Sequence, residues 1–192
     1  RGVVGDLARA VVRQPGEGVH AARLAGLEAA RQARHGVPVV GLGARRHGSL
    51  VDRPYVQTAL QHLAAAGGEV WFKFDAGTAA DIARINGIDV DPHTHARRLA
   101  LCASLCPTWV QTCLFRWDGQ LPSQEQIDHY LEMLEYAGSA ALKGVLLYGV
   151  ARPSFQPEAT HLQQLAPDEL EAIARTVREM LGSAGLTVTV SP

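Results

Sequence analysis

The sequence has few cysteines and no excess of charge of either sign. Its 192 residues include three cysteines, and 18 lysines and arginines face 19 aspartates and glutamates, for a formal net charge of -1. Three cysteines cannot all pair with one another and are too few for a disulfide scaffold, so we expect reduced thiols or metal ligands. The even charge balance also lacks the excess of positive charge that is typical of a protein that binds nucleic acid or an anionic membrane.

Long apolar runs are missing as well. No run approaches the roughly 18 to 20 residues that span a bilayer, and the first residues lack the apolar stretch and cleavage site of a secretory signal. We therefore expect a cytoplasmic protein with no membrane partner. The sequence begins with Arg1 rather than Met, which we interpret as a hint that it is a piece of a longer protein.

Apolar residues make up 47% of the chain, enough for one domain with a single core. We expect residues 1–36 to form a helical leader, a remnant of earlier units of the fold. Residues 37–192 are expected to form the later strand-helix units.

Hydrophobic spacing predicts that strands and helices alternate, which is typical of a parallel sheet wrapped by helices. The expected strands are 37–42, 70–75, 109–115, 144–150 and 186–190. The expected helices are 54–66, 78–86, 92–106, a helix that starts after Ser123, and 167–181. Pro54 suits a first helical position, and Ser123 with Gln126 makes a capping box.

Polar residues follow the predicted strands at the edge where ligands bind in such sheets. They are His47 to Ser49, Lys73 to Asp75, Gln111 with Thr112, and Tyr148 to Arg152. Each has a simpler structural interpretation: Gly48 supplies a turn, Lys73 and Asp75 pair with each other, and Gln111 satisfies neighbouring backbone groups. Their coincidence at one edge nevertheless favours a site.

The cysteines and two histidines are the candidate metal ligands. Cys102 and Cys106 lie one turn apart on a predicted helix and Cys113 lies in a predicted strand, so we favour core thiols over iron-sulfur or zinc ligands. His93 and His95 flank one residue at a helix start, and we favour a solvated helix end over a metal pair. No metal site is therefore predicted.

Four segments resemble the later half of radical S-adenosylmethionine (radical SAM) proteins in order and spacing. The resemblance covers roughly residues 37 to 180. The matching segments are His47-Gly-Ser-Leu-Val-Asp-Arg-Pro54, Glu69-Val-Trp-Phe-Lys-Phe-Asp-Ala-Gly-Thr78, Val110-Gln-Thr112 with Asp118-Gly119, and Leu147-Tyr-Gly-Val-Ala-Arg-Pro153.

The resemblance implies a partial (β/α) barrel of the TIM type with S-adenosylmethionine across its strand ends. In this family a [4Fe-4S] cluster cleaves the small-molecule cofactor S-adenosylmethionine reductively, and the resulting 5′-deoxyadenosyl radical abstracts a hydrogen from a substrate, which is unknown for this chain. The resemblance implies that Lys73 and Arg152 meet anionic groups and that Asp75 accepts hydrogen bonds or orients Lys73. The residues that would bind the cofactor are Gly48, Ser49, Lys73, Asp75, Gln111, Tyr148 and Arg152.

Three features depart from the family pattern. The C-x3-C-x2-C cluster motif is absent, and the spacing of the three cysteines does not replace it. The Gly-Glu-Pro-rich turn survives at most as Gly16-Glu17-Gly18, and His47 stands where the family has Asn. The leading hypothesis is therefore a fragment or truncated form of a radical SAM protein that is inactive as this chain alone.

Two other hypotheses remain open. The first is a degenerate, non-catalytic barrel remnant that acts as a binding or interaction module, with a protein partner at its open sheet edge. The second is an unrelated α/β enzyme or small-molecule binder whose strand ends mimic the family.

Overall fold

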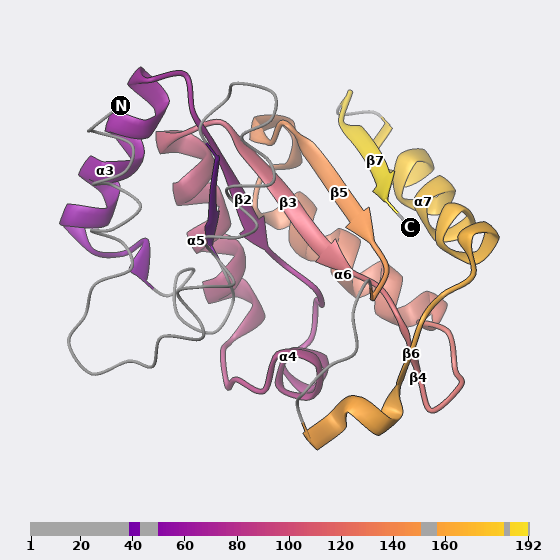
Figure 1. The fold of residues 1–192 in the computed structure, drawn as a ribbon. Helices are drawn as coiled ribbons and strands as arrows, with labels where there is room; N and C mark the ends of the chain where they lie inside the picture. The colour runs from indigo at the N-terminus through magenta and orange to yellow at the C-terminus, as the bar shows by residue number, and fades with distance from the viewer. Residues whose placement is uncertain (1–38, 43–49, 151–156, 183–184, 192) are drawn as a thin grey trace.

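A computed structural model describes residues 39–42, 50–150, 157–182 and 185–191 (Figure 1). The predicted leader over residues 1–36, the turn from His47 to Ser49, and Arg152 lie outside the described residues. Within the described part, no helix is long and apolar enough to cross a membrane.

Five parallel strands form the main sheet (Figure 1). Each strand pairs in parallel with the next, in the order in which they follow along the chain. A sheet whose spatial order follows the chain order is that of a β/α barrel, because a doubly wound sheet reverses its order at a switch point. The predicted partial β/α barrel is confirmed. The strands are β1 (Val39–Leu42), β2 (Glu69–Lys73), β3 (Thr108–Cys113), β5 (Gly144–Tyr148) and β7 (Thr187–Ser191).

The helices begin where their capping residues predict. A proline opens α3, α5 and α7, where its missing N–H is no loss. The Ser123 hydroxyl accepts from the Gln126 N–H and the Gln126 side chain accepts from the Ser123 N–H, so the predicted capping box is confirmed. The helices are α3 (Pro54–Ala65), α4 (Ala79–Asn86), α5 (Pro92–Leu105), α6 (Gln124–Tyr136) and α7 (Pro167–Leu181), with short 3-10 turns η3 (Ser139–Ala141) and η4 (Pro157–His161).

The two faces of the sheet differ in burial. Residues that alternate along β2, β3 and β5, among them Phe72, Val110 and Leu147, are fully buried between the sheet and the helices and form the core. Their neighbours point to the opposite face and are half-buried. We call this opposite face the inner face, because it corresponds to the inside of a β/α barrel.

A small antiparallel ribbon, β4 (Arg116–Trp117) with β6 (Leu162–Gln163), was not predicted. Asp118 and Gly119 follow β4 in a tight turn between Trp117 and Gln120, with φ angles of 50° and 79° that are typical of a type I′ turn. The ribbon and α4 lie beyond the carboxyl ends of the main strands (Figure 1). A two-residue strand carries too little periodicity to be found in a sequence.

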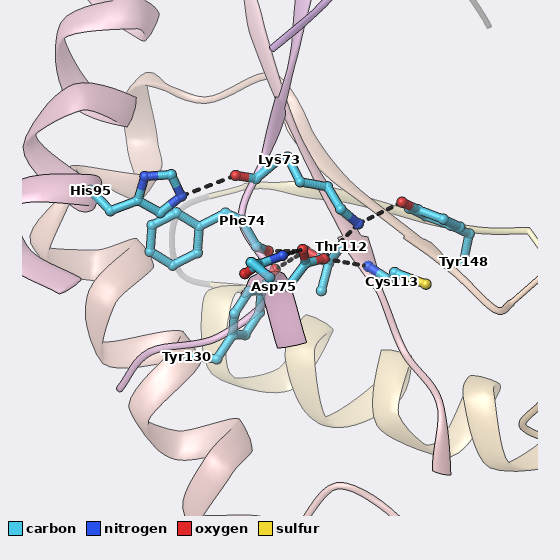
Figure 2. Close-up of polar contacts among 9 residues, drawn as sticks. Lys73, Phe74, Asp75, His95, Thr112, Cys113, Tyr130 and Tyr148 are labelled. Carbon is cyan, nitrogen blue, oxygen red and sulfur yellow. Dashed lines mark hydrogen bonds and ion pairs between the residues drawn. The ribbon is translucent and has the colours of Figure 1, made fainter. Parts of the chain in front are cut away.

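His95 corrects the prediction of a solvated helix end. His93 is exposed, but His95 is 3% exposed. Its ring stacks on Phe74 at 4.8 Å between centroids, and its Nε2 donates to the Lys73 carbonyl at 3.1 Å. His95 therefore holds the end of β2 in place from α5 (Figure 2).

Burial lowers the pKa of His95, against weaker opposing effects of its hydrogen bond to Lys73 and of the Asp75 carboxylate. The folded protein thus keeps a neutral ring, whereas the unfolded chain takes up a proton near pH 6.5. We expect the free energy of unfolding to fall as pH decreases from about 7 to about 5, because the unfolded state then binds more protons. Urea unfolding across that range should show a shallower fall for His95→Gln, which keeps a donor but does not titrate. Equal slopes in the two proteins would contradict this assignment.

Candidate functional site

Lys73 and Tyr148 meet on the inner face at the carboxyl ends of β2 and β5 (Figure 2). The Lys73 ammonium donates to the Tyr148 hydroxyl at 2.6 Å and also lies 4.7 Å from the centre of that ring. β3 separates the two strands, so this contact crosses an intervening strand. Side chains predicted from two separate motifs therefore converge at one point.

Asp75 is the centre of the hydrogen bonds around this point. It lies two residues beyond Lys73, and its side chain is 0% exposed. One oxygen is 2.7 Å from the Lys73 ammonium and accepts the Cys113 backbone N–H at 2.8 Å, while the other accepts from the Asn86 amide at 2.7 Å. Asp75 thus connects β2, β3 and α4.

The charges of this cluster are fixed over the physiological pH range. Burial is the largest single influence on Lys73 and opposes its charged form, but the attraction of the Asp75 carboxylate, together with smaller contributions from Tyr148, Cys113 and the hydrogen bond to Asp75, holds the pKa of Lys73 above its ordinary value. Burial raises the pKa of Tyr148 and raises that of Cys113 to about 11. Near neutral pH the cluster is therefore an ammonium-carboxylate pair flanked by a neutral phenol and a neutral thiol.

Two donors of the inner face are not fully used by the described protein. An ammonium has three N–H groups, and the described contacts of Lys73 use two of them, on Asp75 and Tyr148. The indole Nε1 of Trp71, two residues before Lys73 on the same face, is buried and has no hydrogen-bond partner in the described structure. A buried donor without an acceptor is costly and uncommon.

Not every predicted site residue reaches the cluster. Gln111 pairs in register with Lys73 and its carbonyl accepts from the Phe74 N–H, but its side chain makes no hydrogen bond within the described part of the chain. Gly48, Ser49 and Arg152 lie outside the described residues. The cofactor-binding role of all these residues stays a prediction.

Cys113 differs from the predicted core thiol. It ends β3 on the inner face and is half-buried. Strand alternation predicts the inner face for Cys113, because Cys113 and Gln111 are two residues apart and so share a face. Asn86 also reaches Asp75, although its place at the end of α4 gave no signal of this contact.

The other two cysteines are core residues, as predicted. Cys102 and Cys106 are buried beside Thr108 at the start of β3, and burial raises their pKa values to about 12 and about 11. β3 extends over five further residues from Thr108 to Cys113, roughly 16 Å at the usual rise per residue. Since the three thiols cannot converge, they do not suit an iron-sulfur cluster. No group of three or more His, Cys, Asp or Glu residues placed to hold a metal ion occurs among the described residues.

The overall structure is similar to the crystal structure of a domain of pyruvate-formate lyase-activating enzyme from Bacteroides vulgatus ATCC 8482. The TM-score is 0.50 at 14% sequence identity, and the match covers 92% of this chain and 96% of that chain. That protein belongs to the radical SAM superfamily. The chain shares the fold of that domain.

A second structure, a radical SAM methyltransferase from Sphaerobacter thermophilus, matches with a TM-score of 0.42 at 14% identity. That match covers 70% of this chain and 37% of that chain. No protein-family model and no curated protein matches the sequence.

Proposed function

We propose that this chain forms the later β/α units of a radical SAM domain and binds S-adenosylmethionine on the inner face at the ends of β2, β3 and β5. The observation that carries the proposal is the convergence of Lys73, Asp75 and Tyr148 at this edge of the sheet. Ligands of parallel β/α folds bind outside the carboxyl ends of the strands.

The unused donors of the inner face match the chemistry of S-adenosylmethionine. The third N–H of Lys73 suits the carboxylate of the methionine part, because a charge-assisted hydrogen bond is about twice as strong as a neutral one. The orphaned indole N–H of Trp71 suits a neutral acceptor, such as an oxygen or nitrogen of the nucleoside part. A ligand with both kinds of acceptor would satisfy both donors.

We assign no cluster chemistry to this chain. The three thiols lie in two separate places, so they do not fit the group that supplies the electron in this family. The prediction that the chain is inactive alone is consistent with this geometry and stays a prediction. The residues of the chain are proposed to bind and orient S-adenosylmethionine, and a bound cluster would supply the reductive cleavage.

Calorimetric titration with S-adenosylmethionine tests the proposal. We expect saturable binding that Lys73→Met weakens about tenfold or more, since a hydrogen bond to a charged group contributes roughly 1.5 to 3 kcal/mol. Trp71→Phe should weaken binding about fivefold through loss of one neutral hydrogen bond.

Lys143→Met is the matched control. Lys143 precedes β5, at the opposite end of the strands, and pairs with Glu69 while lying 5.7 Å from the ring of Trp109. It is therefore also a lysine in an ion pair beside an aromatic ring, but far from the proposed site. Equal affinities for the Lys73 and Lys143 variants, with both proteins folded by circular dichroism, would refute the proposal.

A further inference from the structure

A cavity of about 280 Å³ lies beside the strand-end cluster but mainly on the helix side of the sheet. Its walls come mainly from α4, α6, α7 and the loop after β3. It shares Asp75 and Cys113 with the cluster, whereas Lys73, Gln111 and Tyr148 do not line it. The cavity is therefore distinct from the proposed S-adenosylmethionine site.

Most of the wall of this cavity is apolar. Side chains from α6, α7 and the loop after β3 supply most of the surface, among them Leu114, Leu121, Ile127, Ile173 and Val177. Aliphatic walls of this kind favour an apolar ligand, because burying its surface removes it from water.

The polar groups at the strand ends, Thr112, Tyr130 and Asp75, are already bonded to the protein. The Thr112 hydroxyl donates to the Phe74 carbonyl at 2.8 Å and so accepts from Tyr130, also at 2.8 Å. Asp75 accepts from Lys73, from the Cys113 N–H and from Asn86. None of these groups is left to stabilise a charge on a ligand.

Besides Asp75, three charged residues line the cavity, Asp81, Arg84 and the exposed Asp118, and they lie at its mouth. The Asp81 carboxylate accepts from Thr78, from Gln126 and from Arg84, at 2.7 to 2.8 Å. The Arg84 guanidinium is thus paired with Asp81 and is the one cation that lines the described cavity. A charge carried past this mouth into the aliphatic part of the cavity would lose its hydration without meeting an opposite charge there, which is costly.

We propose that this cavity is a binding site for an uncharged, largely apolar ring compound of about two fused rings. The size follows from the volume, because an apolar cavity of about 150 Å³ accommodates benzene and this one is about twice as large. The absence of charge on the ligand follows from the aliphatic walls, which offer a charge no partner. The site does not depend on S-adenosylmethionine binding.

The five isoleucines of the chain provide a direct test. Ile85, Ile127 and Ile173 line the cavity, whereas Ile82 and Ile88 do not. In the full chain with labelled isoleucine methyl groups, 2-naphthol should shift the first three methyl signals in a saturable way and leave the other two in place. Shifts of all five signals, or of none up to the solubility limit of 2-naphthol, would overturn the proposal.

Two comparisons test the size and charge of the ligand. 2-Naphthoate has the same rings with a carboxylate and should bind at least tenfold more weakly than 2-naphthol, and equal or tighter binding would overturn the assignment of an uncharged ligand. Ile173→Trp should fill the cavity and weaken 2-naphthol binding at least tenfold. Leu101→Trp, at a half-buried position on α5 away from the cavity, should change it less than twofold. If Ile173→Trp does not fold, the methyl shifts of the unmodified protein still decide the question.

Discussion

Replacing Asp75 by Ala should destabilise the protein by about 3 to 5 kcal/mol, the range measured when one partner of a buried ion pair is removed. The substitution leaves the half-buried Lys73 ammonium without its carboxylate, whose own side chain is fully buried. It also removes the acceptor of the Cys113 N–H and one acceptor of the Asn86 amide. A loss of this size is a large part of the total stability of a typical domain, and we expect the melting temperature to fall by about 10 °C or more.

Asp52→Ala is the control for this prediction. Asp52 also forms an ion pair, with Arg98 at 2.8 Å, but its side chain is 51% exposed. Exposed pairs contribute roughly 0 to 1 kcal/mol. The free energy of unfolding of this variant should therefore be close to that of the unmodified protein. The double variant Lys73→Met/Asp75→Asn should regain part of the loss, because no unpaired charge remains. A loss below about 1 kcal/mol for Asp75→Ala would show that the ion pair is solvated.

Much of the fold is predictable because the responsible signals are local. The Ser123–Gln126 capping box, the prolines that open helices and the apolar runs of the strands act within a few residues of where they stand. The helix predicted over residues 167–181 has the same bounds in the structure, where it is α7. The β4–β6 ribbon is not, since its two strands are two residues long and separated by more than 40 residues of chain.

The candidate site is predictable only in part. The strand ends that carry Lys73, Asp75 and Tyr148 can be located by alternation, and parallel pairing then brings them to one edge of the sheet. The contact between Asn86 and Asp75 cannot be located in this way, because it depends on how α4 packs after the turn that follows β2. The burial of His95 likewise depends on the angle at which α5 crosses the end of β2. These contacts depend on tertiary packing, which a local sequence pattern does not predict.

The largest steric effect is expected for Gly77→Ala, in the turn that leads from Asp75 to α4. A Cβ atom at Gly77 would lie 2.1 Å from the His129 carbonyl oxygen and 2.5 Å from the Tyr130 backbone nitrogen. These are backbone atoms of α6, so no side chain can rotate away, and either α6 or the turn must shift. Overpacking of this kind costs about 1 to 3 kcal/mol and occasionally more. We expect a loss of about 3 kcal/mol in urea unfolding.

Gly182→Ala gives the opposite sign and so isolates the steric cause. Gly182 has helical backbone angles, φ -61° and ψ -27°, and no described atom lies within 4 Å of its added Cβ. Alanine at such a position reduces the freedom of the unfolded chain and stabilises by about 0.4 to 1 kcal/mol. If Gly77→Ala were also neutral or stabilising, α6 could not lie against this turn. Because Asp75 stands two residues before Gly77, a shift of the turn should also weaken S-adenosylmethionine binding, whereas Gly182→Ala should leave binding unchanged.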